Sequence, residues 1–568
     1  MINNQGSNNL SYTYKLNGDV LINVSWSQGA GGKPERSCLM RRFNVTGLCV
    51  PEEDYMVDIS EKVKKIKGLV DSRCYFTINR ARQYGKTTTL AMLKRTLKDD
   101  YLVILTSFEG LGDESFATPA AFCEAFMILI RRALQFTSAG EEYSNAWFDQ
   151  NVKDFISLSL HITAMCKDRK IVLMIDEVDK VSNNTVFVHF LSMLREKFLA
   201  RKQNVDYTFH SVILAGVYDI KNIKLKMINE GIYTPTATEN KIYNSPWNIA
   251  ANFKVDMSFN PAEIATMLTE YEADHNTGMD IPIIADEIYS YTSGYPFLVS
   301  RICQCVDEEL NKDWTLHGVK EAAQGILREK NILFDDMIKN LANNKNLYDF
   351  LYNLLFIGKE YEFNFYDPVI ELGAIYGFFE ANSRNKVRVA NRFFEIQMYN
   401  YFVSKDSTSN KRITGVLQDD VADGDRFDME LCLRKFAEHY AEMFSERDAE
   451  FIEREGRLLF LSYLKPLING EGFYHIESQF TDLRRMDIVV DFDRDQFIIE
   501  LKLWKGEAEH NRAYEQLAGY MDSKGFSAGY LLTFDFRKGV KEQPYAKWVD
   551  FGGKRIFDVV VNTLPNVH

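Results

Sequence analysis

The chain has 568 residues, of which 46% are hydrophobic, so it has enough apolar material for several folded domains. Its formal net charge of −13 argues against a protein that coats nucleic acid non-specifically, although a local basic groove remains compatible with it. No uncharged apolar run reaches about 18 residues, no signal-peptide pattern opens the chain, and the eight cysteines lack zinc-ligand spacing, so we expect a cytoplasmic protein without a membrane span.

A phosphate-binding loop is the first chemical feature along the chain. An apolar segment at 74–78 predicts a buried strand, and the polar loop 79–88 that follows ends in Gly85, Lys86 and Thr87 before a helical pattern begins. Such a loop can bind phosphates through its backbone N–H groups and the helix N-terminus. Lys86 would contact the β- and γ-phosphates of ATP, and the Thr87 hydroxyl would ligate Mg²⁺. The other predicted nucleotide-binding residues are Arg82 and Thr88.

A second segment supplies the acids that a nucleotide site needs. The apolar run 171–175 is followed by Asp176 and Glu177, which is typical of a Walker B strand. Asp176 would hold Mg²⁺, and Glu177 would activate the attacking water. Further apolar segments at 102–108 and 211–216 alternate with helical stretches and predict a parallel sheet with helices on both faces.

The phosphate loop lacks the usual first glycine, because Arg80 stands in its place. The stretch 80–87 instead resembles the glycine-poor loop of the AAA-ATPase-like family, a STAND/AAA+-type P-loop family often fused to a nuclease domain, and 55–60 resembles a motif upstream of that loop in the same family. The stretch 293–301 resembles the segment that opens the lid helix in STAND and related ATPases. These resemblances imply an ATP-dependent AAA-type ATPase with a helical lid.

The region from about 345 to 403 predicts a helix, a second helix, a short hairpin and a return helix. This order resembles the winged-helix domain that often follows such ATPase modules. Several basic residues cluster near the expected wing: Arg384, Lys386, Arg388 and Arg392. They could contact phosphates, or they could solvate one face of an acidic protein, and the sequence leaves both interpretations open.

The C-terminal part contains a predicted hairpin with converging charges. Two β-branched, apolar segments flank a polar turn within 487–502. If the turn centres between residues 493 and 494, Asp487 lies opposite Glu500, and Lys502 shares their face because strand side chains alternate. Burying these charges is costly unless a divalent cation lies between the carboxylates. Oxygen ligands of this kind suit Mg²⁺ or Mn²⁺.

This arrangement resembles the Asp…Glu-x-Lys core of the PD-(D/E)xK nuclease superfamily over roughly 430–560. The resemblance implies that Asp487 and Glu500 ligate the metal and that Lys502 orients the attacking water. Glu477, on a predicted strand before the hairpin, or Glu455, on an amphipathic run, would assist. Gln516, on the following helix, could touch the scissile phosphate or the water, and helix-surface solvation is its alternative. A solvated hairpin in which Glu500 and Lys502 are only cross-strand partners is the structural alternative for the whole motif.

Together these observations predict a multidomain α/β protein with a P-loop NTPase sheet, a helical lid, a winged helix and a C-terminal restriction-endonuclease-like α/β/α domain. The expected boundaries are an N-terminal segment of unassigned role at 1–50, the ATPase core at 51–260, the lid at 261–340, the winged helix at 341–404, a linker at 405–425 and the nuclease-like domain at 426–568. The expected cofactors are ATP and Mg²⁺, with Mn²⁺ as an alternative at the nuclease site.

The expected function is ATP-regulated cleavage of nucleic acid, with DNA preferred as the substrate and a role in defence or mobile-element biology. A homo-oligomer is left open. The alternative function is a nucleotide-dependent switch or scaffold whose nuclease-like domain binds nucleic acid without cutting it.

Overall fold

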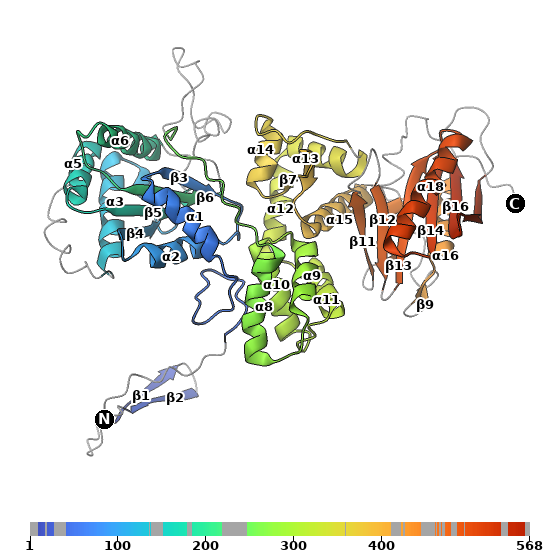
Figure 1. The fold of residues 1–568 in the computed structure, drawn as a ribbon, viewed down its shortest axis with the longest axis horizontal. Coiled ribbons are helices and arrows are strands. Elements are labelled where there is room, and N and C mark those ends of the chain that lie inside the picture. The colour runs from blue at the N-terminus through green and yellow to red at the C-terminus, as the bar shows by residue number, and fades with distance from the viewer. Residues whose placement is uncertain are drawn as a thin grey trace, which may run out of the picture.

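The computed structural model describes residues 9–16, 20–27, 41–135, 137, 152–178, 185–217, 247–357, 359–409, 422–423, 426–444, 460–461, 463–464, 467–468, 472–478, 486–492, 495–535 and 544–562. In Figure 1 an α/β module and a second sheet lie at opposite ends of the molecule, with two mainly helical modules between them. Near the N-terminus, β1 (Asn9–Leu16) and β2 (Val20–Ser27) form an antiparallel hairpin. None of the helices in the described residues is both long enough and apolar enough to cross a membrane.

The α/β module contains a four-stranded sheet in which every neighbouring pair is parallel. Its order is β3-β6-β5-β4, so β6 separates the strand before the phosphate loop from the strand that ends in Asp176. Parallel strands place their carboxyl ends at one edge of the sheet, where ligands bind in such folds. The strands are β3 (Tyr75–Asn79), β4 (Leu102–Ser107), β5 (Ile171–Asp176) and β6 (Ser211–Gly216).

Helices cover both faces of this sheet, as the alternation of strands and helices predicted. Alternate residues of β5 enter two different cores: Val172 and Met174 pack on one side, and Leu173 and Ile175 pack on the other. The first side is covered by α1 (Ser60–Asp71) and α2 (Lys86–Leu97). The second is covered by α3 (Pro119–Gln135), α5 (Phe155–Cys166) and α6 (Thr185–Lys202), with the short η1 (Asp113–Phe116) beside α3.

A helical module follows the sheet in the chain. Asn260 caps the first of its helices in a reciprocal capping box with Glu263. Gly294 has φ +74°, and a Cβ at this position would collide with the backbone of Phe259. This glycine therefore fixes the turn that begins α10 at Pro296, next to the phosphate loop. The helices are α8 (Pro261–His275), α9 (Ile281–Thr292), α10 (Pro296–Glu308) and α11 (Leu316–Arg328).

The next module has the element order that the sequence predicted: helices, a two-stranded hairpin and a return helix. Its elements are α12 (Ile332–Asn343), α13 (Lys345–Tyr352), η4 (Asn353–Ile357), α14 (Pro368–Ile375), β7 (Phe379–Ala381), β8 (Val387–Val389) and α15 (Arg392–Ser409). The last helix extends to Ser409, past the expected boundary at residue 404, and its apolar side chains up to Phe402 are buried in the core.

The basic residues near the hairpin are engaged within the protein. Lys386 Nζ lies 3.5 Å from Glu362, and Arg388 pairs with Glu380 across the hairpin at 2.5 Å. The Arg392 guanidinium lies 4.6 Å from the centroid of the Tyr291 ring. These contacts favour the structural interpretation of the basic cluster over direct phosphate binding.

The C-terminal module is built on a six-stranded sheet of order β11-β12-β13-β14-β16-β15. Only β13–β14 and β14–β16 are parallel pairs, and α18 (Glu507–Lys524) makes the crossover between β13 and β14. Figure 1 shows α16 (Met429–Phe444) and α18 beside this sheet. The strands are β11 (Gly472–Ser478), β12 (Met486–Phe492), β13 (Asp495–Leu503), β14 (Ala528–Asp535), β15 (Tyr545–Phe551) and β16 (Lys554–Asn562), and a two-residue hairpin, β9 (Ala422–Asp423) and β10 (Arg426–Phe427), precedes α16.

The register of the β12–β13 hairpin is the predicted one. The pairs run from Phe492↔Asp495 to Ile488↔Ile499, so the turn centres between residues 493 and 494. One further step in this register would place Asp487 opposite Glu500. On its other side, Asp487 pairs with Glu477 of β11.

Candidate functional sites

The phosphate loop connects β3 to α2 and contains two residues in the left-handed region. Gln83 has φ +56° and Gly85 has φ +73°. The left-handed conformation costs a non-glycine residue about 1–2 kcal/mol, so surrounding contacts must hold Gln83 there. No side chain caps the N-terminus of α2, which leaves the N–H groups of its first turn available for an anion.

The predicted nucleotide-binding and metal-binding residues of the ATPase gather around this loop. Lys86 is buried, and its Nζ donates to the carbonyl oxygens of Arg80 (3.1 Å) and Ala81 (2.9 Å), so the ammonium lies within the loop. The Thr87 hydroxyl donates to Asp176 Oδ2 at 2.6 Å. The sheet thus brings together two residues that lie 89 positions apart in the chain.

Glu177 follows directly and also adopts a left-handed conformation, with φ +54°. Its backbone N–H donates to Asp176 Oδ1 at 3.0 Å, and it lines the same cavity as Lys86 and Thr87. Backbone strain of this kind persists only where the surroundings enforce it, and it concentrates at functional sites. The conformation supports a role for Glu177 at the mouth of the site.

Contacts from distant segments hold the loop in shape. The Tyr295 hydroxyl donates to the carbonyl oxygen of Arg82, and the Arg82 guanidinium pairs with Asp336 of α12 at 2.9 Å. The Tyr84 hydroxyl hydrogen-bonds to Ser258 at 2.6 Å, and burial raises the pKa of Tyr84 above its usual value. The helical modules therefore contact the phosphate loop directly, so a change in its shape would reach them.

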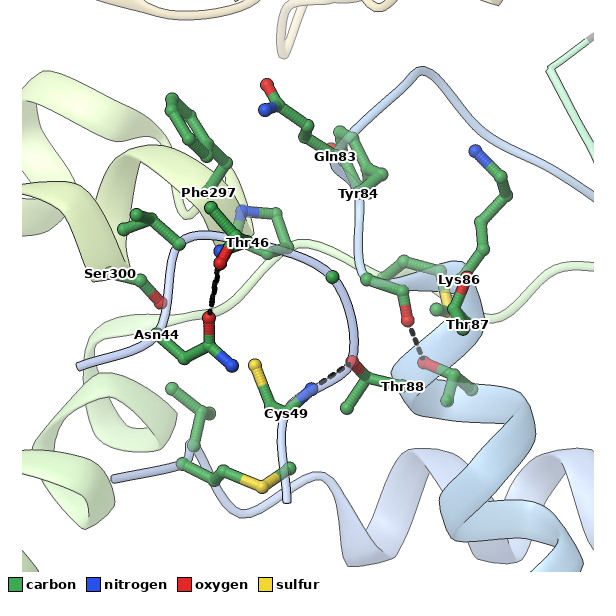
Figure 2. A pocket seen from close by; sticks show the side chains of 18 of the residues that line it. Asn44, Thr46, Cys49, Gln83, Tyr84, Lys86, Thr87, Thr88, Phe297 and Ser300 are labelled. Atoms are coloured by element: carbon green, nitrogen blue, oxygen red, sulfur yellow. Dashed lines mark hydrogen bonds between the residues drawn. The ribbon is translucent and has the colours of Figure 1, made fainter. Parts of the chain in front are cut away.

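A cavity of about 680 Å³ opens beside the loop and is shown in Figure 2. Its volume is in the range typical of small-molecule sites. One wall comes from the segment 44–59 before α1, and another comes from α10, where Phe297 and Ser300 lie. The Cys49 N–H donates to the Thr88 hydroxyl at 3.3 Å, which ties the first wall to the phosphate loop. All five predicted loop residues line the cavity: Arg82, Gly85, Lys86, Thr87 and Thr88.

The part of the cavity wall at 44–50 was missed from the sequence, whereas 55–60 and 293–301 were linked to the ATPase family without being placed at a cavity. Asp54 fixes the segment 44–50 by accepting from Val50 N–H (2.7 Å) and from the Asn44 amide (3.2 Å). Asn44 Oδ1 in turn accepts from Thr46 N–H at 2.8 Å. This buried aspartate among turn residues is a signal of an ordered loop, but nothing in its local pattern indicates contact with a loop near residue 85.

In the C-terminal module the structure brings together two of the predicted nuclease residues. Glu500 is 1% exposed, and Lys502 Nζ lies 2.6 Å from its Oε1. Both belong to β13 and face α18, on the same side of the sheet as Ile498. A buried ion pair on a sheet face is costly to assemble, and a solvated hairpin pair would not be buried. The geometry therefore argues against the structural alternative of a surface hairpin.

For the remaining predicted nuclease residues, the structure describes only part of each residue or none of it, except for Gln516. The backbones of Glu477 and Asp487 are paired, but their side chains, and the whole of Glu455, lie outside what the structure describes. Gln516 is half-buried on α18. Among the described side chains, no group of three or more His, Cys, Asp or Glu residues could hold a metal ion, and the nuclease assignments stay predictions.

A comparison with protein families matches residues 58–363 to a model described as an AAA-like domain. This range includes the phosphate loop, Asp176, Glu177 and the helical module, and the prediction of a P-loop ATPase module of AAA type is thereby confirmed. Most of the first cavity wall, residues 44–57, lies before the matched range.

Among curated proteins, an uncharacterized WD repeat-containing protein of Synechocystis sp. is 25% identical over 249 residues, which is 42% of this chain and 19% of that protein. The chain thus corresponds to about a fifth of that relative. Among solved structures, a Walker-type ATPase of Pyrococcus abyssi is 11% identical, with a TM-score of 0.45, over 63% of this chain and 99% of that chain. The ORC2 protein of Aeropyrum pernix is 12% identical, with a TM-score of 0.31, over 61% of this chain and 93% of that chain.

Proposed function

The chain belongs to the AAA-like domain family, and from this premise we propose that it binds and hydrolyses ATP in the cavity beside the phosphate loop. The observation that carries the proposal is the 2.6 Å hydrogen bond between Thr87 Oγ1 and Asp176 Oδ2 at the end of that loop. A hydroxyl and a carboxylate in contact, beside a buried lysine, form the donor set that a nucleotide–Mg²⁺ complex requires.

Each residue of the proposed ATP site then has a separate role. Lys86 would exchange its bonds to the loop carbonyls for phosphate oxygens, and the N–H groups of the first turn of α2 would bind the same anion. Thr87 and Asp176 fit Mg²⁺ through their oxygens, and the metal, when bound, supplies charge neutralisation at the phosphates. Glu177 would accept a proton from the attacking water at its carboxylate. The apolar walls from 56–59 and α10 would bind the base.

A second activity is supported by the buried Glu500–Lys502 pair. We propose that the C-terminal module is a PD-(D/E)xK-type nuclease, in which Glu500 and Asp487 hold Mg²⁺ or Mn²⁺ and Lys502 orients the water that attacks a phosphodiester. DNA is the expected substrate. The register that would set Asp487 opposite Glu500 supports this assignment, and the order of elements before it supports a winged helix between the two modules.

The two activities define an ATP-regulated nuclease. The alternative is a nucleotide-dependent switch whose C-terminal module binds nucleic acid without cutting it. The burial of Glu500 favours the nuclease, because a binding surface has no need for a buried carboxylate beside a lysine.

The ATPase proposal is tested with Glu177→Gln, which keeps the shape of the side chain and removes its charge. The variant should bind ATP as tightly as the wild type and hydrolyse it at least about tenfold more slowly, measured by phosphate release with Mg²⁺ present. Glu114→Gln, a change outside the cavity lining in the same module, is the control. Undiminished hydrolysis by Glu177→Gln would reject the assignment of Glu177, and a wild type that never hydrolyses ATP would favour the switch.

A further inference from the structure

A buried polar cluster lies beside the Glu500–Lys502 pair. Its centre is Asp558 of β16, which is fully buried. Asp558 Oδ2 accepts from the hydroxyls of Tyr514 (2.6 Å) and Tyr545 (2.8 Å) and lies 3.0 Å from His510 Nε2. Its other oxygen, Oδ1, is buried and has no hydrogen-bond partner among the described residues. A carboxylate held this way costs stability, which points to a role beyond packing.

The cluster fixes how the imidazole of His510 is oriented. We assign the ring hydrogen to Nε2 from its 3.0 Å contact with Asp558, because a carboxylate oxygen accepts hydrogen bonds. The other ring nitrogen, Nδ1, lies 3.5 Å from the Thr533 hydroxyl, at the long limit of a hydrogen bond. The ring also packs against Trp504, with centroids 4.7 Å apart. His510 thus connects Asp558 on one side to Thr533 on the other.

The position of Thr533 makes this connection relevant to the proposed nuclease site. Thr533 of β14 is the register partner of Lys502 of β13, and partners in parallel strands point to the same face. The connection from β13 to α18 is short, and His510 lies in the first turn of α18, where its N–H donates to Gly506 O at 3.0 Å. That turn therefore lies over the carboxyl ends of β13 and β14, where Lys502 projects.

We propose that His510 is a positioning residue for Lys502, acting through Thr533 and held in place by Asp558. The inference rests on the proposed nuclease function. It distinguishes His510 from the two tyrosines. Their hydroxyls contact Asp558 and also Nε2 of His510, at 3.2 Å for Tyr514 and 3.3 Å for Tyr545, whereas His510 has a second polar atom, Nδ1, toward Thr533. A purely structural cluster would make the three donors to Asp558 equivalent.

The test uses the full chain and matched variants. His510→Gln keeps an amide donor for Asp558 but removes Nδ1, and Thr533→Val removes the hydroxyl with little change of shape. Tyr545→Phe is the control: it removes one hydrogen bond to Asp558 and one contact with Nε2 of His510, and it leaves Nδ1 and Thr533 in place. Cleavage of DNA with Mg²⁺ gives kcat and KM, and thermal unfolding gives the structural effect. The environment of Lys502 is read independently from the ¹³C NMR signal of dimethylated lysine, assigned by its loss in Lys502→Arg.

His510→Gln and Thr533→Val should each lower kcat about tenfold to 100-fold with KM unchanged, as expected for a displaced catalytic group. The double variant should be no slower than the slower single variant, because both act along one path. The Lys502 signal should shift in both variants and stay at its wild-type position in Tyr545→Phe, whose kcat should also be unchanged.

Two outcomes would overturn the inference: an unshifted Lys502 signal in His510→Gln, or equal losses of kcat in His510→Gln and Tyr545→Phe. Failure of the nuclease function has a different signature. A wild type that does not cleave, or a Glu500→Gln variant that cleaves like the wild type, would reject the nuclease, and the Lys502 signal would still decide whether His510 positions that lysine.

Discussion

The two candidate sites are assembled in different ways. The ATPase site is built on one continuous loop, and the long-range hydrogen bond between Thr87 and Asp176 completes its polar centre. The C-terminal site is assembled across neighbouring strands, so its composition depends on the registers of β11, β12 and β13. A local loop motif can therefore be recognised from the sequence alone, whereas a site built across a sheet also requires the correct register.

This difference predicts unequal sensitivity to substitution. Asp487 and Glu500 are the proposed metal ligands of the C-terminal site, so Asp487→Ala and Glu500→Ala should each lower metal-dependent cleavage by at least about 10³-fold while the fold is largely kept. Circular dichroism and thermal unfolding check the fold, and Asp522→Ala, an exposed change on α18, is the control. Cleavage at the wild-type rate by either variant would remove the nuclease from the account.

A substitution in the phosphate loop should lower the affinity for ATP and leave the fold intact. Lys86→Ala removes a charge that backbone N–H groups cannot replace, and it should weaken ATP binding roughly 100-fold, as for a lost hydrogen bond to a charged group. Isothermal titration calorimetry measures the affinity, and Lys98→Ala, at the exposed end of the same helix, should bind like the wild type. If Lys86→Ala keeps wild-type affinity, the nucleotide does not bind at this loop.

A substitution in the packing that supports the phosphate loop should have a smaller effect, and this effect is on the free energy of unfolding. Gly294→Ala should lower the free energy of unfolding by about 2–4 kcal/mol, because the added Cβ meets the Phe259 backbone at positive φ. Gly325→Ala is the matched control: it lies within α11 with open space around it and should raise stability by up to about 1 kcal/mol. Denaturant titration measures the free energy of unfolding of both variants. Equal values would refute the close approach of Gly294 to the Phe259 backbone.

The smallest expected effect is a pH dependence of the stability of the α/β module. Burial lowers the pKa of His210 to about 4 from its ordinary 6.5. Above pH 6.5 the histidine is neutral in both the folded and the unfolded state, so its full contribution to the free energy of unfolding is present. As the pH falls toward 4, only the unfolded state takes up the proton, so stability is lost in that window. His210→Gln should show a shallower loss, while His317→Gln, at an exposed histidine, should follow the wild type. Identical acid profiles of His210→Gln and the wild type would contradict the shift.

Much of the fold was predictable because its signals are local. The apolar run before Asp176, the loop ending in Lys86 and the turn between residues 493 and 494 each fix an element and its end. The rest depends on contacts between distant segments. No local pattern indicates that β6 lies between β3 and β5, that Asp336 reaches Arg82, or that His510 meets Asp558, because each arises from packing of the completed modules. The boundaries between domains and the assigned site residues stay predictions.

Under the proposed function, nucleotide binding at one module controls cleavage by the other. The most direct measurement is the rate of Mg²⁺-dependent DNA cleavage with and without ATP, in the wild type and in Lys86→Ala, with Glu500→Ala as the inactive reference. ATP should change the wild-type rate at least several-fold, a coupling of about 1 kcal/mol or more, and leave the rate of Lys86→Ala unchanged. Equal wild-type rates with and without ATP, or cleavage by Glu500→Ala, would contradict the claim.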